Sequence, residues 1–502
     1  MNLKLSRWPF DTVLVANRGE IALRVLRTVK KLGLKGAVVY HALDRHAPAV
    51  RLADRAIEIT GATPVAAYLD GAQIIAAAQS CVAGDRTVAI HPGYGFLSEN
   101  AAFARAVEAA GLIFVGPRPE QIERMGDKVR ARGFVHQAGF PVAPSAVEDD
   151  DPATFVARAR AVGAPLLIKP SAGGGGKGMR IVRDLARLES EIERARSETS
   201  RSFGDGRLYV ERYVENPRHI EVQVLGDAHG HVLHLYEREC SVQRRFQKIV
   251  EETPSPALTP ALRAKICETA AGIARAVGYR NAGTVEFIFG ASGEFYFLEM
   301  NTRLQVEHPV TEQITGLDLV AEQLRVAAGE ELGYAQADLA TRGHAIELRL
   351  YAEDPARGYA PTTGPILRLI PPQGEGVRWD GGVAEGGEVT SAFDPMLAKL
   401  IVHADDRAQA IARARRALAE TVLLGCKTNA AFLGRLLRHP AFERGEIHTG
   451  FLDAHPEIAA EPPLAEATVH KLLAAAALST RPLRDVADAV PDLYAALGAW
   501  RN

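Results

Sequence analysis

Short apolar runs alternate with segments of helical spacing through the first part of the chain. The run Thr12–Ala16 is followed by a turn, after which Ile21, Val25 and Leu26 recur at the spacing of one helix face. Three more apolar runs of strand length follow, at 36–40, 88–90 and 113–116. Because strands that alternate with helices form parallel sheets, we predict an N-terminal α/β domain with a parallel sheet.

The pattern changes after the proline-rich segment Pro141–Ser145, which we interpret as a boundary. A second unit contains the strands Pro165–Ile168 and Leu208–Val214. Farther along, helical spacing predicts helices at 260–277, 317–328 and 408–421. Apolar runs at 345–351, 366–370 and 396–402 predict strands of a largely antiparallel sheet. A chain of 502 residues is long enough for two to four domains.

The stretch from Thr284 to His308 predicts a β-hairpin that runs into a polar loop. Two β-rich runs, Thr284–Gly290 and Glu294–Met300, flank Ser292-Gly293, a dipeptide typical of tight hairpin turns. If this dipeptide forms the turn, Glu286 lies opposite Glu299. Asn301 lies two residues beyond Glu299 and therefore on the same face of the strand.

Like charges directly opposite each other destabilise a strand pair, so we expect a cation between Glu286 and Glu299. A carboxylate and amide cluster suits Mg²⁺ or Mn²⁺ better than Zn²⁺, which favours His and Cys. The alternative is an edge hairpin with solvated acids. The Phe, Ile and Leu neighbours favour a buried hairpin over that alternative.

Composition excludes several classes of protein. The charged fraction is 24% and the formal net charge is −2, so the chain has no global bias toward nucleic acid or anionic membranes. The cysteines form no CxxC pair, which argues against a disulfide framework or a structural zinc site. We find neither a signal-peptide pattern nor a run of about 18 apolar residues. We therefore expect a cytoplasmic protein that is neither exported nor membrane-spanning.

A glycine-rich loop from Ser171 to Arg180 follows an apolar strand. Four consecutive glycines let backbone N–H groups approach a phosphate chain, and Lys169 and Lys177 supply positive charge. The loop is not a Walker A motif, because Met179 stands where Ser or Thr is required. The alternative is a flexible linker. Apolar runs on both sides favour a hairpin whose tip contacts nucleotide phosphates and moves as a lid.

Six ordered motifs resemble biotin carboxylase, an ATP-grasp enzyme, across roughly residues 10–453. They are HPGYGFLSEN (91–100), MGDK (125–128), IKPSAGGGGKGMR (168–180), ENPRHIEVQV (215–224), CSVQRRFQK (240–248) and EMNTRLQVEHPVTE (299–312). The resemblance implies an α/β fold, with α+β organisation in the C-terminal part. Its expected domains are an N-terminal α/β domain (1–116), a helical linker (117–142), the ATP-grasp lid (143–213), the C-terminal ATP-grasp and biotin carboxylase domain (214–453) and the start of a linker region (454–502).

The implied reaction carboxylates N1′ of biotin after ATP has activated bicarbonate to carboxyphosphate. Bicarbonate must lose a proton to attack the γ-phosphate, and Glu307 is our candidate for the general base. Arg303 and Lys248 match the family positions that hold bicarbonate, together with Gln305 and the backbone of Val306.

Arg349 matches the arginine that steadies the enolate form of biotin. Its role rests on the resemblance, because an arginine beside Glu347 on an alternating strand is often part of a surface ion pair.

Other site positions are also implied by the resemblance. Glu286, Glu299 and Asn301 match its metal ligands, in agreement with the hairpin argument. Taken alone, Lys169 is equally well read as a surface lysine and His219 as a packing histidine. The expected nucleotide contacts are Lys128, Lys169, Gly174, Gly175, Gly176, Lys177, Gly178, Met179, Glu211, Arg212, Val214, His219 and Gln243.

Phe246 departs from the family pattern, which usually has His or sometimes Asn at this nucleotide-phosphate contact. Phenylalanine cannot donate that hydrogen bond, so we predict weaker ATP binding or a shifted phosphate contact. The surrounding segment, Cys240–Glu252, is dense in charge, and in isolation it is best interpreted as a solvated surface.

The segments ELRLYAEDP (347–355) and FDPMLAKLI (393–401) resemble acyl-CoA carboxylase α-subunits more than pyruvate carboxylase. Those subunits carry biotin at a Met-Lys site, but no lysine follows a methionine here. We therefore expect biotin on a carrier domain in trans, a separate carboxyltransferase subunit, and a homodimer or larger holoenzyme. The ending ALGAWRN suggests a chain that is truncated within the linker region.

Two alternative functions remain open from the sequence. One is another ATP-grasp ligase that forms an acyl phosphate, and the other is a nucleotide-binding regulatory module without chemistry. Retention of Glu307, Arg349 and the acidic metal positions argues against the second.

Overall fold

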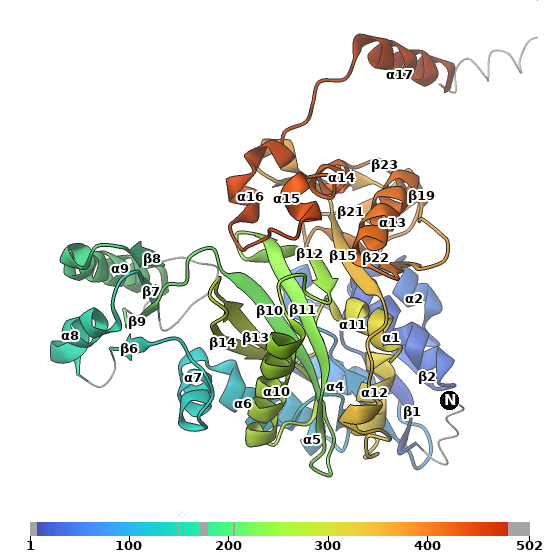
Figure 1. Ribbon diagram of the computed structural model, residues 1–502. Helices are drawn as coiled ribbons and strands as arrows, with labels where there is room; N and C mark the ends of the chain where they lie inside the picture. The colour runs from blue at the N-terminus through green and yellow to red at the C-terminus, as the bar shows by residue number, and fades with distance from the viewer. Residues whose placement is uncertain (1–7, 149–150, 171–178, 204–205, 480–502) are drawn as a thin grey trace, which may run out of the picture. The chain divides into compact units, whose positions relative to one another are not determined.

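A computed structural model describes residues 8–148, 151–170, 179–203 and 206–479 (Figure 1). The first sheet contains five parallel strands in the order β3-β2-β1-β4-β5, and so confirms the predicted parallel sheet. Alternate residues of β1 enter different cores: Val13 and Val15 lie in one hydrophobic cluster and Leu14 in another. A sheet covered on both faces explains why its strands are continuous apolar runs.

The strands of this sheet are β1 (Phe10–Val15), β2 (Lys35–Tyr40), β3 (Arg55–Glu58), β4 (Thr87–His91) and β5 (Ile113–Phe114). Its helices are α1 (Gly19–Lys31), α2 (Pro48–Leu52), α3 (Pro64–Ala67), α4 (Gly71–Gln79) and α5 (Ala101–Ala109), with a 3₁₀ turn at Ala42–Asp44. The edge strand β3 carries no apolar run, because most of its side chains are exposed. The sequence pattern therefore gave no signal for it.

Two helices, α6 (Pro119–Gly126) and α7 (Lys128–Gln137), lead to a small antiparallel sheet. Its order is β6-β9-β7-β8, and α8 (Pro152–Val162) and α9 (Leu188–Phe203) pack against it around a separate hydrophobic cluster. The strands are β6 (Ser145–Val147), β7 (Leu166–Pro170), β8 (Arg180–Val182) and β9 (Leu208–Arg212), with a 3₁₀ turn at Leu185–Arg187. The glycine loop, including Gly174, Gly175, Gly176, Lys177 and Gly178, lies outside the described residues.

The large sheet has eight strands in the order β14-β13-β10-β11-β12-β15-β22-β20, and every neighbouring pair is antiparallel. Its strands are β10 (Arg218–Gly226), β11 (Val232–Arg244), β12 (Gln247–Thr253), β13 (Asn281–Phe289), β14 (Phe295–Asn301), β15 (His344–Tyr351), β20 (Val377–Gly381) and β22 (Met396–Ala404). Around it lie α10 (Pro260–Val277), α11 (His308–Thr315), α12 (Leu319–Ala327) and α13 (Arg407–Glu420), with a 3₁₀ turn at Gln336–Asp338 (Figure 1). This confirms the predicted antiparallel sheet.

The β13–β14 hairpin pairs Glu286 with Glu299, as predicted, but the predicted turn is wrong. Phe289 pairs with Phe295, so five residues, 290–294, connect the strands. Gly290 N–H donates to the Glu294 carbonyl at 2.8 Å, which closes the turn over 291–293, and Gly293 adopts a φ of +89°. This register is one residue away from the predicted one. A β-bulge at the level of Leu298 shifts the pairing back before Glu286, because it adds one residue to β14.

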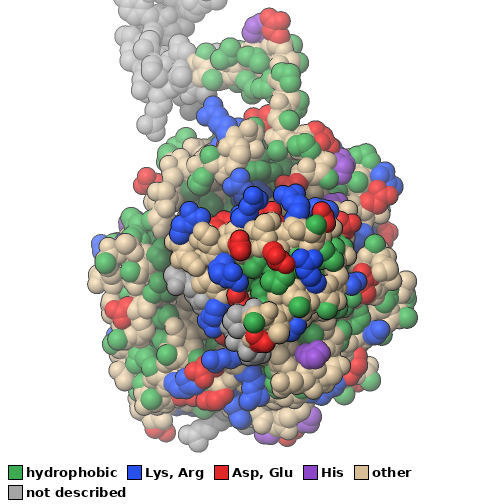
Figure 2. Space-filling view, turned by 90° about the vertical axis from the view of Figure 1, so that its left-hand side faces the viewer, with side chains coloured by type: hydrophobic (Ala, Val, Ile, Leu, Met, Phe, Trp, Pro, Cys, Tyr) green, Lys and Arg blue, Asp and Glu red, His purple; other side chains and the backbone are tan. Residues whose placement is uncertain are grey.

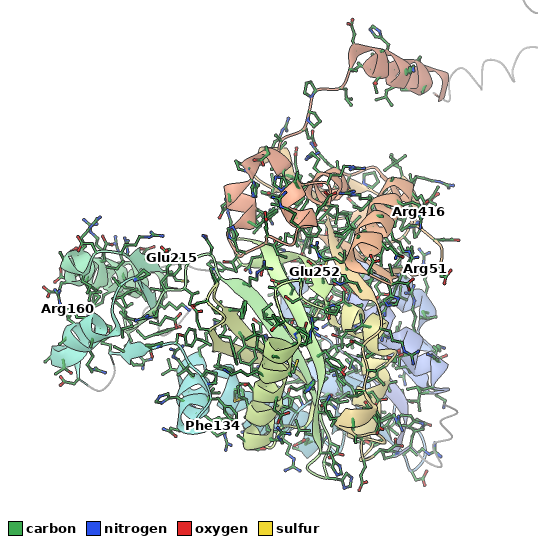
Figure 3. All side chains as sticks on the ribbon, viewed as in Figure 1. Arg51, Phe134, Arg160, Glu215, Glu252 and Arg416 are labelled. Carbon is green, nitrogen blue, oxygen red and sulfur yellow. The ribbon has the colours of Figure 1, made fainter. Side chains whose placement is uncertain are left out.

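The charged segment 240–252 forms the end of β11, a turn and nearly all of β12, so its interpretation as a solvated surface is wrong. Glu251 and Glu252 are buried, because β12 lies in the interior of the large sheet between β11 and β15. Figure 3 shows Glu252 in the middle of the body. Charge density along a sequence cannot distinguish a solvated surface from a buried ion-pair network.

The remaining strands form three two-stranded sheets. The predicted strand 366–370 is shorter, as β19 (Arg368–Ile370), and pairs with β23 (Val422–Leu424) outside the large sheet. The others are β16 (Glu353–Asp354) with β17 (Ala360–Pro361), and β18 (Gly364–Pro365) with β21 (Glu388–Val389). A 3₁₀ turn at Pro355–Arg357, the helices α14 (Ala430–Leu436), α15 (Pro440–Glu443) and α16 (Phe451–Ala454), and a 3₁₀ turn at Pro456–Ile458 complete this part.

The chain divides into two compact units, Met1–Ile458 and Ala459–Asn502, and α17 (Glu466–Ser479) belongs to the second. Within the described ranges, no helix has both the length and the apolar character needed to cross a bilayer. On the face drawn in Figure 2, Lys and Arg side chains lie among Asp and Glu side chains. That mixture agrees with a net charge close to zero.

Candidate active site

A cavity of about 740 Å³ lies between the small sheet and the large sheet. It is lined by residues of β7 and β9 on one side and of β10, β11, β12, β13, β14 and β15 on the other. Every predicted site residue within the described ranges lines this cavity. They are Lys128, Lys169, Met179, Glu211, Arg212, Val214, His219, Gln243, Lys248, Glu286, Glu299, Asn301, Arg303, Gln305, Val306, Glu307 and Arg349.

Glu307 lies at the N-cap position of α11, and its carboxylate is held between two cations. Lys248 Nζ donates to Glu307 Oε1 at 2.6 Å, and Arg349 Nη2 donates to Oε2 at 3.0 Å. Burial alone would raise the pKa of Glu307, but Lys248, Arg349 and Arg238 outweigh it and hold the pKa well below its usual range. The side chain is therefore held ionised, and these two cations make it a weak proton acceptor while they bind it.

Lys248 contacts three carboxylates. Its Nζ lies 2.6 Å from Glu221, 3.0 Å from Glu286 and 2.6 Å from Glu307. Burial opposes the charged form, yet the three acids raise the pKa of Lys248 well above its usual value. Lys248 on β12 reaches across β11 to Glu221 on β10 and across both β11 and β10 to Glu286 on β13, and so joins these acids and Glu307 into one network.

The predicted metal residues form an oxygen-rich group on β13 and β14. Glu286 Oε1 accepts from Asn301 Nδ2 at 2.9 Å and from Gln305 Nε2 at 3.0 Å. Glu299 pairs with Lys128 at 3.0 Å. The repulsion expected between the two acids is thus relieved by separate cations, Lys248 and Lys128. Carboxylate and amide oxygens that line one cavity are the donor set that Mg²⁺ and Mn²⁺ prefer.

Arg303 is fixed by neighbours on three sides. It donates to Glu99 Oε2 at 2.8 Å, to Gln305 Oε1 at 2.7 Å and to Asn301 Oδ1 at 3.0 Å. The Val306 carbonyl accepts from the buried Lys399 at 2.7 Å. These contacts hold the loop between β14 and α11 in place, so that Arg303, Gln305 and Glu307 all reach the cavity.

Arg349 is not part of a surface ion pair with Glu347, because both side chains are buried. Its guanidinium binds Glu251 on β12, with Nε donating at 2.6 Å, and Glu307 at 3.0 Å. Burial raises the pKa of Glu251 to about 7, against the lowering effect of Arg349 and with a further rise from Glu307. The arginine therefore lies between a group that titrates near neutral pH and the candidate base.

The residues on the small-sheet side form a second charged group. Lys169 Nζ lies 2.5 Å from Glu211 Oε1, and Arg132 lies 3.1 Å from the other oxygen. Lys169 is largely buried in this pair, so the alternative of a surface lysine is wrong. His219 is also buried, with Nε2 at 2.8 Å from Glu286 Oε2, which makes it part of the charged network and not a packing residue.

Phe246 lines the cavity with 65% of its surface exposed. It is the second residue of a two-residue turn between β11 and β12, and both Arg245 (φ +47°) and Phe246 (φ +69°) lie in the left-handed region. Asn, Asp and Gly tolerate this conformation best, and a bulky aromatic residue there is uncommon. Its side chain therefore contacts both the cavity and solvent.

Several lining or supporting residues were not found from the sequence. Glu221 and Arg238 form a fully buried pair, with Arg238 Nε donating to Glu221 Oε1 at 2.5 Å, and Glu221 lies opposite Glu286. The alternation in IEVQVL does place Glu221 and Gln223 on one face, which was the available signal. Glu251 and Lys399 gave no such signal, because their partners are distant in the sequence.

Three protein-family models match consecutive parts of the chain. They are described as the biotin carboxylase N-terminal domain (residues 9–122), the carbamoyl-phosphate synthase L chain ATP-binding domain (127–335) and the biotin carboxylase C-terminal domain (347–454). Together they cover most of the first unit.

Curated relatives match over nearly the same length of this chain. The biotin carboxylase of Halalkalibacterium halodurans is 49% identical over 453 residues, which are 89% of this chain and 98% of that protein. The mitochondrial methylcrotonoyl-CoA carboxylase α-subunit of Mus musculus is 47% identical over 445 residues, which are 88% of this chain and 62% of that protein.

Two solved structures share the fold. One is the dimer of the biotin carboxylase domain of Hydrogenobacter thermophilus 2-oxoglutarate carboxylase, in complex with MgADP, ADP and bicarbonate. Its TM-score is 0.84 at 44% identity, and the match covers 91% of this chain and all of that one. The other is the biotin carboxylase subunit of a pyruvate carboxylase. Its TM-score is 0.80 at 45% identity, and the match covers 90% of this chain and all of that one. The identities to the methylcrotonoyl-CoA carboxylase subunit and to the pyruvate carboxylase structure are similar. They therefore do not show whether this chain resembles acyl-CoA carboxylases more than pyruvate carboxylases.

Proposed function

Because this chain belongs to the biotin carboxylase family, an ATP-grasp family, and is an ATP-dependent biotin carboxylase, we propose a role for each residue of the cavity. The observation that carries the proposal is that Glu307, Lys248, Arg303 and Arg349 line the same cavity as the oxygen-rich group of Glu286, Glu299 and Asn301. A base, an anion clamp and a set of metal ligands are thus in one place.

Glu307 is the proposed general base. It accepts the proton of bicarbonate as a bicarbonate oxygen bonds to the γ-phosphorus of ATP and ADP leaves, which yields carboxyphosphate. The low pKa of Glu307 keeps it deprotonated before the step. Binding of anionic substrates at Lys248 and Arg349 would weaken their hold on Glu307 and make it a stronger base.

Arg303, Lys248, Gln305 and the backbone of Val306 are the proposed bicarbonate clamp. Two cationic side chains offset the cost of holding bicarbonate beside another anion, the triphosphate. Arg349 is proposed to stabilise the enolate form of biotin while N1′ gives up its proton to the departing phosphate and bonds to the carboxyl carbon of carboxyphosphate.

Glu286, Glu299 and Asn301 are the proposed ligands of Mg²⁺ or Mn²⁺, and their oxygen atoms fit either ion. A bound ion supplies charge neutralisation at the phosphates. Before it binds, Lys248, His219 and Lys128 neutralise the two acids. The proposed ATP contacts are Lys128, Lys169, Met179, Glu211, Arg212, Val214, His219 and Gln243, with residues 143–213 acting as the lid.

The proposed setting is the first half-reaction of a biotin-dependent carboxylase in the cytoplasm. Biotin would arrive on a carrier domain in trans and pass its carboxyl group to a carboxyltransferase subunit, with an acyl-CoA as the proposed acceptor. A homodimer is the proposed state of the chain, which light scattering of the purified protein would test.

One assay tests the activity. ATP hydrolysis is measured with and without bicarbonate, and then with free biotin added. We expect hydrolysis to depend on bicarbonate and to increase with biotin. Stimulation by ammonia or an amino acid instead would support another ATP-grasp ligase, a class to which the carbamoyl-phosphate synthase match of the central region points. No stimulation by any of them would favour a regulatory module.

A further inference from the structure

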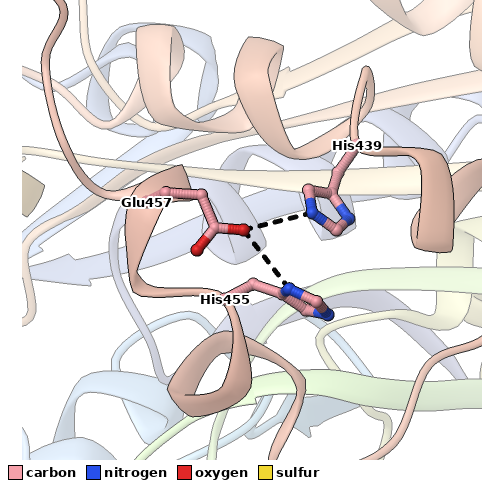
Figure 4. A group of neighbouring side chains, drawn as sticks. All are labelled: His439, His455 and Glu457. Carbon is pink, nitrogen blue, oxygen red and sulfur yellow. Dashed lines mark ion pairs between the residues drawn. The ribbon is translucent and has the colours of Figure 1, made fainter.

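His439, His455 and Glu457 form a compact group in the last part of the first unit (Figure 4). His439 precedes α15, His455 follows α16, and Glu457 lies in the final 3₁₀ turn. None of the three lines the catalytic cavity. Two imidazoles and a carboxylate are the donor set that divalent zinc and its neighbours among the transition metals prefer.

Glu457 Oε1 lies at the distance from each ring nitrogen that two ligands of one metal ion would have, and all three ligand atoms lie within 4.8 Å of one another. Glu457 Oε1 is 3.2 Å from His439 Nε2 and 3.3 Å from His455 Nδ1. A tetrahedral ion with bonds of 2.0–2.1 Å separates neighbouring ligands by roughly 3.3 Å. Figure 4 shows one carboxylate oxygen of Glu457 joined by dashed lines to both rings, and the ring centroids are 4.2 Å apart. Small rotations of the side chains would open room for an ion among the three atoms.

The scaffold around the group is held without a metal. Phe451 packs against both rings, with centroid distances of 5.7 Å to His439 and 4.9 Å to His455. Arg435 Nε donates to the Ile458 carbonyl at 2.7 Å and fixes the 3₁₀ turn that carries Glu457. Preorganised ligands lose little conformational entropy on binding.

The group is open on one side. The His439 and His455 side chains are 18% and 29% exposed, whereas that of Glu457 is 61% exposed. Solvent can therefore supply the fourth ligand, and an ion can enter and leave. His439 Nδ1 is buried and has no hydrogen-bond partner in the described part of the chain. The second ring nitrogen of a metal-bound histidine usually makes a hydrogen bond to a supporting group. Where that hydrogen bond is missing, as at His439 among the described residues, the metal affinity is lower by about 10- to 100-fold.

We propose that His439, His455 and Glu457 bind one zinc-class divalent ion, reversibly, at a site separate from the catalytic metal. The oxygen-only catalytic group suits Mg²⁺, and this nitrogen-containing group does not, so the two sites select different ions. The segment between the ligands contains Thr449, which lines the catalytic cavity. An ion at this site would cross-link both ends of that segment and restrict its motion.

The test uses the full-length protein, stripped with a chelator and held in excess Mg²⁺. Zn²⁺ is titrated against a chromophoric chelator, and Co²⁺ is used to read out tetrahedral coordination from its visible absorption. We expect His455→Ala and Glu457→Gln to bind one equivalent less than the unmodified protein. His470→Ala is the matched control, because His470 lies beside Glu466 in a more exposed pair, and it should keep the full stoichiometry.

Glu457→Gln is included because the Glu457 side chain is mostly exposed, so this variant should fold like the unmodified protein. Zn²⁺ should raise the melting temperature of the unmodified protein and of His470→Ala but not that of Glu457→Gln. Equal stoichiometry and equal thermal shifts in all variants would overturn the proposal and leave the group as an ordinary His–Glu ion pair.

Discussion

Glu307 combines two properties that a catalytic base needs, burial and an ionised carboxylate. Its side-chain contacts are with the cations Lys248 and Arg349 and with the thiol of Cys240. We predict that Glu307→Gln lowers kcat for bicarbonate-dependent ATP hydrolysis by roughly 100- to 10,000-fold, the usual contribution of general base catalysis. The KM for ATP should change little, because these contacts do not include Lys128 or Lys169. Steady-state kinetics at saturating bicarbonate provide the measurement.

The control for this change is Glu330→Gln, at a glutamate that pairs with Arg325 outside the cavity. It should keep the full kcat. If Glu307→Gln were as active as the control, another group would have to take the bicarbonate proton.

Phe246 offers a test of the phosphate contact that the family pattern implies. We predict that Phe246→His lowers the KM for ATP, because an imidazole can donate to phosphate and phenylalanine cannot. Initial rates as a function of ATP concentration would measure it.

The backbone at this position must be controlled for, because Phe246 has a φ of +69°. Phe246→Gly relieves that conformation without adding a donor. If Phe246→Gly lowered the KM as much as Phe246→His, the turn conformation and not a hydrogen bond would be responsible. An unchanged KM in Phe246→His would make Phe246 a neutral substitution.

Among the secondary-structure elements, β12, β15 and α13 are joined through one buried carboxylate. Glu252 on β12 lies 2.7 Å from His344 on β15 and 2.7 Å from Arg407 on α13. Burial would raise the pKa of Glu252, but His344 and Arg407 outweigh it and lower the pKa to about 2. The elements are therefore held together by an ion-pair network whose strength depends on pH.

The sign of that dependence follows from the lowered pKa. Above the usual glutamate pKa, the carboxylate is ionised in both states and the folded state holds it more favourably. That stabilisation, roughly 3 kcal/mol for a shift of this size, is lost as the pH falls from about 4.5 toward 2. We predict that Glu252→Gln is less stable at pH 7 and loses less stability on acidification than the unmodified protein.

Urea unfolding at pH 7 and at pH 4 to 3 would measure this difference. Glu388→Gln, at an exposed position on β21, serves as the control and should follow the unmodified protein. Parallel stability curves for Glu252→Gln and the unmodified protein would show that Glu252 contributes no pH-dependent stability.

For the molecule as a whole, the catalytic cavity belongs to the first of its two compact units. The family models also end at residue 454. We predict that a chain ending at Ile458 folds and keeps kcat within about twofold, because domain boundaries fall where few contacts cross. A chain ending at Glu446 should fail to fold, since it lacks the buried Phe451 and Leu452. Loss of activity on removal of 459–502 would assign those residues to the catalytic fold.

The sequence by itself determined the fold class, the family and many of the side chains that line the cavity. Strand and helix periodicity is local, so the parallel sheet and α10 could be read from it, α10 with its bounds unchanged at Pro260–Val277. The ordered motifs singled out residues that line one cavity, because a motif is recognised from residue identity and spacing alone.

Only the tertiary structure decided which charges neutralise one another. The register inferred from the sequence placed Glu286 opposite Glu299, although the turn assumed for it was wrong. The bulge at Leu298 shifts the register by one residue and so restores this pairing. The ion-pair partners of Glu307, Arg349 and Glu252 come from strands and helices far apart in the chain. The burial of these side chains depends on the elements that pack over them. Such pairings are set by the contacts of distant segments, and local patterns in a sequence hold no information about them.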